Sequence, residues 1–138
     1  MLAAWRALLN AHAAVTTRIE AALADADLPP LRWYDALWPL YQATGRRLRV
    51  GGLARQVTLS RTGLTRLIDR LEREGLVKRE LAPEDRRGSY IALTREGAEL
   101  LRRMWPVYQR ALEEAFVARV RNPTTLRRAL NPLSAENG

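Results

Sequence analysis

The clearest alternation of apolar and polar positions lies at residues 60–74, which read SRTGLTRLIDRLERE. Apolar side chains recur at the i, i+3, i+4, i+7 spacing of one helix face, at Leu64, Leu67, Ile68 and Leu71. Ser60 precedes the pattern as a candidate N-cap, and Gly75 follows it as a candidate C′ residue. The pattern predicts a helix with one face on a core and an opposite face that carries Thr62, Thr65, Arg66, Asp69 and Arg73.

The segments on either side of this helix predict a winged helix-turn-helix. Residues 51–57 (GGLARQV) have the pattern of a short helix at helix-turn-helix distance, with Leu53, Ala54 and Val57 pointing inward. Residues 76–81 and 90–93 predict two strands joined by a polar loop at residues 82–89. In the first strand, the alternation predicts inward positions for Val77, Arg79 and Leu81. Residues 46–50 (RRLRV) predict a short third strand beside this hairpin.

Long apolar helical patterns lie toward both ends of the chain. Residues 2–23 carry an apolar face wide enough for two neighbours, made by Leu2, Trp5, Leu9, His12, Thr16, Ile19 and Leu23. Residues 95–120 predict a second long helix, capped by Thr94 and bent at Pro106, and residues 124–130 predict a short final helix. Each long face exceeds what so small a module covers alone. The pattern therefore predicts a homodimer in which two copies cover each other across a two-fold axis.

These elements predict a single domain over residues 1–138, mainly α with a small β-wing. The winged helix-turn-helix lobe is expected at about residues 31–94, and the dimerisation helices at about residues 2–24 and 95–130. A breaker at residues 25–30 precedes a helix at residues 31–44, which Pro39 should kink or end early.

The positive charge of the chain concentrates in the winged-helix segment. The net charge is +8, and residues 46–87 hold twelve basic and six acidic side chains. Residues 60–66 have two arginines, three hydroxyls and no carboxylate, so a phosphate or base edge would meet donors there without repulsion. A basic module of this topology is typical of a binder of double-stranded DNA. An ordinary amphipathic surface helix is the alternative, and the neighbouring elements argue against it.

Two further groups of side chains have a functional and a structural interpretation. The loop PEDRRGS presents Asp85, Arg86 and Arg87 at its tip, which fits either insertion into a minor groove or a solvated charged turn. The aromatic side chains of residues 31–44 fit either a packed core or a small-molecule cavity, and His12 fits either a packed interface or a ligand site. The candidate ligand-binding residues are His12, Trp33, Tyr34, Trp38 and Tyr41.

The composition excludes several classes of function. The chain has no cysteine and one histidine, so disulfides, thiolate sites and a histidine metal cluster are not expected. It has no catalytic set or phosphate loop, which argues against an enzyme and against a bound cofactor. Neither an apolar run of membrane-spanning length nor a secretion signal occurs, so we expect no membrane contact and a cytoplasmic location.

Residues 28–101 resemble the multiple-antibiotic-resistance regulator (MarR) family of bacterial transcription factors. The resemblance rests on LSRTGLTRLIDRLEREGLVKRE at residues 59–80, on Asp85-Arg86-Arg87-Gly88, and on the LTREG that begins at Leu93. It implies a triangular two-fold dimer with a winged helix at each lower corner. It further implies contacts to the major groove from Ser60, Arg61, Thr62, Thr65 and Arg66, contact to the minor groove from Arg87, and support of the wing by Asp85 and Arg86.

The expected function is therefore that of a transcriptional repressor that binds a pseudo-palindromic operator as a homodimer. Members of the family often release DNA on binding phenolic or lipophilic compounds, so the resemblance also implies a small aromatic or lipophilic effector. The chain departs from the family in its short last helix and in Pro39 and Pro106. The alternatives are a winged-helix module that binds protein and a DNA-binding protein that responds to no ligand.

Overall fold

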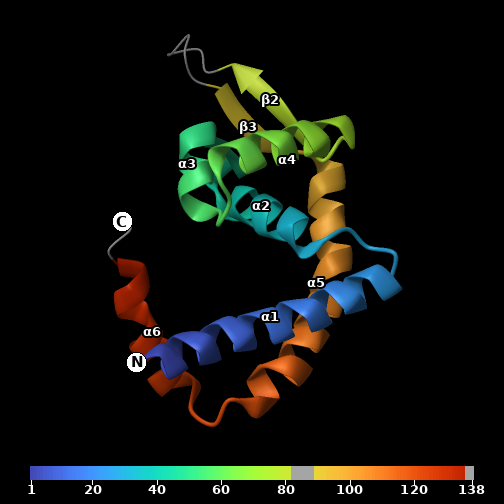
Figure 1. Cartoon of the computed structure of the whole chain (residues 1–138). Coiled ribbons are helices and arrows are strands. Elements are labelled where there is room, and N and C mark those ends of the chain that lie inside the picture. Colours follow the sequence, from blue (N-terminus) through green and yellow to red (C-terminus); the bar gives the residue numbers. More distant parts are fainter. Residues whose placement is uncertain (82–88, 136–138) are drawn as a thin grey trace.

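The computed structural model describes residues 1–81 and 89–135 as helices joined to a small sheet (Figure 1). The elements in chain order are α1 (Leu2–Asp25), α2 (Leu31–Gln42), η1 (Thr44–Arg46), β1 (Arg47–Arg49), α3 (Val50–Gln56), α4 (Arg61–Arg73), β2 (Val77–Leu81), β3 (Ser89–Leu93), α5 (Arg95–Ala115), η2 (Val117–Arg119) and α6 (Pro123–Ala135). This order confirms the predicted fold class, mainly α with a small β-wing.

The elements from α2 to β3 form the winged helix. The sheet is antiparallel with the strand order β1-β3-β2, so the short strand predicted at residues 46–50 pairs with β3 and not with β2. The helices α3 and α4 lie against this sheet and α2 (Figure 1). Leu37, Leu53, Ile68 and Ile91 come from four different elements and are all buried in their common core.

The local signals around α4 act as the sequence predicts. The Ser60 hydroxyl oxygen accepts a hydrogen bond from the backbone N–H of Gly63 at 3.1 Å, which caps the first turn. Gly75 follows the helix with φ of +75°, a left-handed conformation that glycine adopts without a steric penalty. Between these ends the stripe Leu64, Leu67, Ile68 and Leu71 is buried.

The predicted alternation of burial along β2 is wrong. Val77 is buried, but the Arg79 side chain lies at the surface and Leu81 is 82% exposed. β2 is an edge strand of the sheet, and the hairpin extends past the helices (Figure 1). Only the first residue of β2 reaches the core. Beyond Val77 neither face of the strand is covered, so burial does not alternate along it.

The body of the molecule is made by α1 and α5, which pack against each other. The two buried residues of α1, Ile19 and Leu23, lie in its last two turns, while the N-terminal half extends beyond α5 (Figure 1). The end predicted for α5 at residue 120 is wrong, because the backbone turns at Phe116 (φ −125°, ψ −61°). α6 runs beyond the predicted residue 130 to Ala135, and Pro132 lies within it.

A compact junction joins the winged helix to α5. The Thr94 hydroxyl donates to the carbonyl oxygen of Gly75 at 2.6 Å and accepts from the N–H of Gly97 at 3.0 Å. A Cβ atom on Gly97 would lie 2.2 Å from the carbonyl oxygen of Leu76, so only glycine fits this approach. The end of α4 and the start of α5 are therefore held by the same few atoms.

Candidate nucleic-acid interface and aromatic cavity

The N-terminal half of α4 gathers the predicted major-groove residues on one exposed surface. Ser60, Arg61, Thr62, Thr65 and Arg66 are all exposed, and the buried leucines of the same helix lie behind them. This half of the helix contains no carboxylate. It therefore presents hydroxyls, guanidinium groups and free backbone N–H groups, the donors that bind phosphates and base edges.

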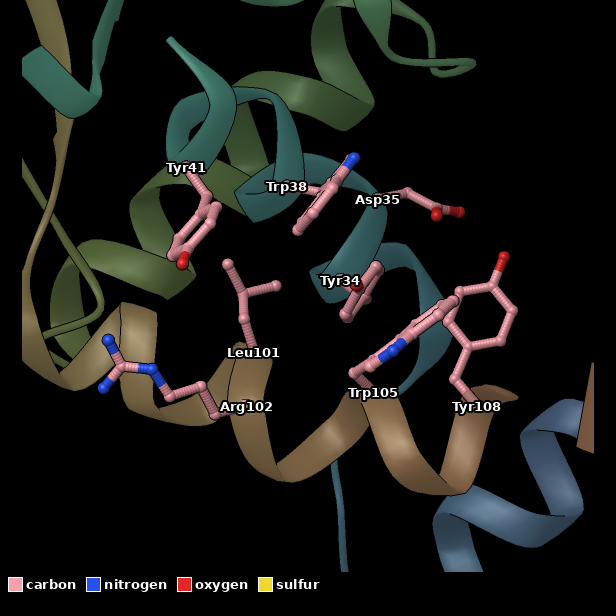
Figure 2. Close-up of a pocket in the computed structure, with 8 residues that line it drawn as sticks. All are labelled: Tyr34, Asp35, Trp38, Tyr41, Leu101, Arg102, Trp105 and Tyr108. Atoms are coloured by element: carbon pink, nitrogen blue, oxygen red, sulfur yellow. The ribbon is translucent and has the colours of Figure 1, made fainter. Parts of the chain in front are cut away.

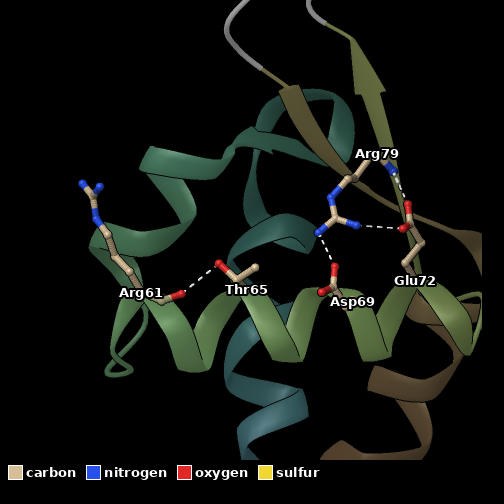
Figure 3. A network of polar contacts seen from close by, with 5 residues as sticks. All are labelled: Arg61, Thr65, Asp69, Glu72 and Arg79. Atoms are coloured by element: carbon tan, nitrogen blue, oxygen red, sulfur yellow. Dashed lines mark hydrogen bonds and ion pairs between the residues drawn. The ribbon is translucent and has the colours of Figure 1, made fainter.

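Two of these hydroxyls already make hydrogen bonds within the protein, which limits the donors and acceptors that they can present to DNA. The Thr65 hydroxyl donates to the carbonyl oxygen of Arg61 at 2.9 Å, as Figure 3 shows. Its single proton is thus engaged, and outward it presents oxygen lone pairs and a methyl group. The Ser60 oxygen is engaged by the cap at Gly63. Thr62 and the two arginines have no such constraint within the helix.

The second half of α4 carries acidic residues that bind an arginine of β2 (Figure 3). The Arg79 guanidinium donates to Asp69 at 2.6 Å and to Glu72 at 2.7 Å. The second oxygen of Glu72 accepts from the Arg79 backbone N–H at 3.2 Å. The hydrogen bond to Asp69, together with the charge of Glu72, raises the pKa of Arg79 above its ordinary value. The sequence prediction placed Arg79 in the core and missed this contact.

The wing tip is the remaining part of the predicted interface. Asp85, Arg86 and Arg87 lie outside the described residues, so their roles remain predictions. The two strands of the hairpin are described: β2 starts at Val77 just after α4, and Val77 pairs with Leu93, the last residue of β3 (Figure 3).

A cavity of about 500 Å³ lies between α2 and α5 (Figure 2). Three of the five candidate ligand residues, Tyr34, Trp38 and Tyr41, line it because they share one face of α2. The other lining residues are Asp35, Leu101, Arg102, Trp105 and Tyr108. Of these, Leu101, Trp105 and Tyr108 belong to the apolar face of α5 and could have been found only by knowing that α2 packs against α5.

Two of the candidate ligand residues lie elsewhere. Trp33 is one position from Tyr34, about 100° around the helix, and it packs against the core with Arg70 5.8 Å from its ring centroid. His12 is exposed on α1, outside the cavity. The aromatic side chains of α2 thus lie on two faces: Tyr34, Trp38 and Tyr41 line the cavity, and the partly buried Trp33 packs against the core elsewhere.

Aromatic rings form a continuous stack along the cavity (Figure 2). The ring centroids of Tyr41 and Trp38 are 5.4 Å apart, those of Trp38 and Tyr34 5.9 Å, and those of Tyr34 and Trp105 6.1 Å. The first two pairs are inclined by 11°. These rings stack on one another, and the largely apolar wall that they form suits a flat apolar molecule, which would bind by burial of area.

Burial raises the pKa of three groups that line the cavity, Tyr34, Asp35 and Tyr108. Burial raises the pKa of Tyr34 to about 12, with smaller contributions from Tyr108 and Asp35. Burial also raises the pKa of Asp35, and the nearby Glu20 adds to the effect. Among the described residues no group of three or more His, Asp or Glu side chains could hold a metal ion. No helix in the described ranges is long and apolar enough to cross a membrane.

Known proteins share both the fold of this chain and part of its sequence. The family model for the MarR family matches residues 26–88. The crystal structure of AbsC, a MarR family transcriptional regulator from Streptomyces coelicolor, superposes with a TM-score of 0.88 at 30% identity, covering 98% of this chain and 92% of AbsC. Sco3205, a regulator of the same family and organism in complex with DNA, gives a TM-score of 0.84 at 30% identity over 98% of this chain and 83% of Sco3205.

The sequence comparison agrees over a shorter stretch. The HTH-type transcriptional regulator PrsX of Escherichia coli is 35% identical over 83 residues, which is 60% of this chain and 50% of PrsX. The chain therefore spans about half the length of the curated relatives that it matches first. The structural relatives are covered over more of their length, 92% of AbsC and 83% of Sco3205.

Proposed function

Because the chain belongs to the MarR family of transcriptional regulators, we propose that it binds double-stranded DNA through α4 and represses transcription in the cytoplasm. The family consists of regulators and not of enzymes, which agrees with the expectation from the sequence. A protein that occupies an operator excludes polymerase from it. Loss of the protein should therefore raise transcription from the controlled promoter.

The observation that carries this proposal is the surface of α4. Five exposed side chains with hydroxyl or guanidinium groups share its N-terminal half, and its buried stripe anchors the helix to the core. A helix fixed in this way can enter a major groove without losing its own packing. The DNA complex of the structural relative Sco3205 supports the same use of the fold.

A salt titration tests DNA binding directly. Neutralised phosphates release counterions, so the logarithm of the binding constant should fall steeply and linearly with the logarithm of the salt concentration. The measurement uses a random duplex and a duplex selected from a random pool by the protein. A flat salt response would favour the alternative, a winged-helix module that binds protein.

Arg66 is the proposed reader of base edges. It lies one turn inside α4 on the exposed face, where a guanidinium can donate twice to guanine O6 and N7. Arg66→Ala should cost ~1–3 kcal/mol on the selected duplex and much less on random DNA. Arg73→Ala, two turns farther along the same face, is the matched control. Equal losses of Arg66→Ala on both duplexes would make Arg66 a phosphate contact.

The wing supplies the second proposed contact. Arg87→Ala should weaken binding more when A·T-rich sequence flanks the site than when G·C-rich sequence does, because a narrow minor groove attracts arginine more strongly. The two variants together separate contact to bases from sensing of groove width. A loss that is the same for both flanks would instead assign Arg87 to the phosphates.

The proposed assembly is a homodimer formed by the terminal helices. Leu2, Trp5 and Leu9 are exposed on the N-terminal half of α1, and Leu133 is exposed on α6. Apolar surface of this kind is a site of association. Two recognition helices related by a two-fold axis would fit a near-palindrome with half-sites about one helical turn, roughly 10 bp, apart.

A charged substitution tests the dimer without removing the buried end of α1. Trp5→Glu with Leu9→Glu should shift the chain from dimer to monomer in sedimentation and weaken binding to the palindrome. Thr17→Glu, which adds one carboxylate at an exposed polar position of the same helix, is the control. A double variant that remains dimeric would exclude α1 as the interface.

The proposed effector site is the aromatic cavity between α2 and α5. The cavity joins a helix of the winged lobe to a helix of the body, so a ligand wedged there would change their relative position and with it the spacing of two recognition helices. Its stacked rings suit a small aromatic or lipophilic compound.

Tryptophan fluorescence can follow this binding, since Trp38 and Trp105 line the cavity. Aromatic compounds should quench the fluorescence in a saturable way and release DNA over the same concentration range. Trp38→Phe should reduce the quenching, whereas Trp5→Phe, outside the cavity, should leave it unchanged. Saturable quenching with no change in DNA affinity would show that the ligand binds without regulating, and would favour a protein whose DNA binding is independent of ligand.

A further inference from the structure

The outward face of α4 has an electrostatic conflict within it. Thr65 and Asp69 are one turn apart on the same exposed side, and Figure 3 shows both on the side that faces β2. The Asp69 side chain is 51% exposed. If α4 lies in a major groove, Asp69 and Glu72 are carried toward the phosphates, where an unpaired carboxylate is repelled.

Arg79 is placed to resolve this conflict. Its guanidinium donates to Asp69 at 2.6 Å and to Glu72 at 2.7 Å, so one cation serves two carboxylates that lie nearly a turn apart on α4. Planar, multidentate geometry of this kind is particular to arginine. The contact comes from another element, β2, and does not depend on the helix alone.

A second contact fixes the strand itself. β2 is the edge strand of the sheet, and the Arg79 backbone N–H donates to Glu72 at 3.2 Å. The Glu72 carboxylate therefore accepts from both the main chain and the side chain of Arg79. This attaches the first strand of the wing hairpin to the helix and sets the direction in which the hairpin leaves it.

We propose that Arg79 is a positioning residue for DNA binding, which neutralises Asp69 and Glu72 on the outward face of α4 and ties the wing hairpin to that helix. Its guanidinium is committed to the protein and does not bind a phosphate. The inference rests on the proposed function, that α4 binds DNA.

Charge removal distinguishes this role from two others. Arg79→Ala should weaken binding to both random and selected duplexes by on the order of tenfold, because the repulsion between the freed carboxylates and phosphates is independent of sequence. The triple variant Arg79→Ala, Asp69→Asn, Glu72→Gln should recover binding to within about threefold of the natural chain, since no carboxylate remains to be neutralised. Gln at position 72 keeps an oxygen for the backbone N–H of residue 79.

Each rival role gives a different result with the triple variant. If Arg79 binds a phosphate, the affinity stays low and the salt slope falls by about one unit. If Arg79 only stabilises the fold, the affinity stays low and the melting temperature falls. Either result overturns the inference. If Arg79→Ala alone does not fold, the folded triple variant still decides the question by its affinity and slope.

Arg110→Ala is the matched control. This substitution also removes one positive charge and one ion pair, the contact of Arg110 with Glu114 at 3.3 Å, but on an exposed part of α5 away from α4. It should leave binding nearly unchanged. A natural chain with no salt-dependent DNA binding would overturn both the proposed function and this inference. DNA binding by the natural chain without recovery in the triple variant would overturn the inference alone.

Discussion

The winged lobe buries its apolar residues, whereas the terminal helices leave many of theirs exposed. In the lobe, Leu37 is 0% exposed, and Leu53 and Ile91 are equally enclosed by α2, α3, α4 and the sheet. At the ends, Trp5 is 55% and Leu9 47% exposed, and α6 contributes no buried residue within its described length. The lobe completes its core within one chain, while the ends leave apolar surface uncovered.

The two regions nevertheless have the same kind of sequence pattern. Apolar residues also recur at helical spacing in α1, although they are less sharply confined to one face than in α4, and only Ile19 and Leu23 of α1 reach the core of the chain. A helical pattern of apolar residues predicts that one helix face is buried. Whether elements of the same chain bury it depends on how many of them lie beside the helix and how long they are. This difference is the physical reason for proposing a second copy at the ends.

The largest expected effect comes from truncating one leucine in the lobe. Leu37→Ala removes buried methyl groups from a fully enclosed site and should lower the free energy of unfolding by ~2–5 kcal/mol. Denaturant unfolding measures this loss, which should not depend on protein concentration. Leu9→Ala at the uncovered end is the comparison.

Leu9→Ala should behave differently in the same measurement. Its effect should be smaller and should shift with protein concentration, because Leu9 would be buried only between two chains. If both variants lost stability equally and independently of concentration, the contrast between a complete lobe and incomplete ends would be lost.

The junction between the two regions gives the next largest effect. Gly97→Ala places a Cβ atom 2.2 Å from the carbonyl oxygen of Leu76 and 2.6 Å from Cδ1 of Leu93, so α5 must move away from the lobe. We expect a loss of ~1–3 kcal/mol, the usual cost of overpacking. Thermal unfolding of the full chain measures it.

Gly51→Ala is the control for this substitution. Gly51 is also helical, but a Cβ atom there would meet nothing within 4 Å. Alanine should therefore leave stability unchanged or raise it by up to ~1 kcal/mol, through its better helix propensity. Equal losses at both positions would show that the close approach at Gly97 is not the cause.

The sequence predicted the lobe well because its signals are local. Ser60, Gly75 and the leucine stripe between them each act within one helix, and the structure places all of them as expected. The same holds for the cap at Thr94. Propensity, capping and periodicity depend on neighbours in the sequence, so one chain without any structure is sufficient to detect them.

The misses came from contacts between distant elements. Arg79 was assigned to the core by alternation, whereas it binds two carboxylates of α4, and no period of two encodes that contact. The cavity was found only from the side of α2, because its other wall belongs to α5, which is distant in the sequence. His12 follows the apolar spacing but lies on the uncovered half of α1.

Tyr34, in the aromatic cavity between α2 and α5, should make the free energy of unfolding depend on pH. Burial raises the pKa of Tyr34 from its ordinary value of 10.0 to about 12 in the folded chain. The folded state then holds the phenolic proton more tightly than the unfolded state does. This contribution is fully present below pH 10 and is lost as pH rises from about 10 to 12.

A comparison with Tyr34→Phe isolates this contribution. Phenylalanine cannot ionise, so the difference in unfolding free energy between the natural chain and the variant should change by ~1–2 kcal/mol across that range. Tyr108, whose pKa burial also raises, is common to both proteins. A difference that is constant with pH would show that the Tyr34 phenol is as accessible as an ordinary tyrosine.

The smallest effects are expected from removing a side-chain helix cap, once in the lobe and once at the end of the chain. The Ser60 oxygen accepts from the N–H of Gly63 at 3.1 Å in the lobe, and the Asn122 side-chain oxygen accepts from the N–H of Thr125 at 3.0 Å at the start of α6. Ser60→Ala should lower the free energy of unfolding by ~1 kcal/mol, because α4 and the core unfold together. Asn122→Ala should lower it by less than ~0.5 kcal/mol, since α6 can fray alone without opening the core. Chemical denaturation gives the global value, and amide exchange in the first turn of each helix gives the local one. If Asn122→Ala cost as much as Ser60→Ala, α6 would belong to the same cooperative unit as the lobe, and the ends would be less independent than their exposed apolar residues indicate.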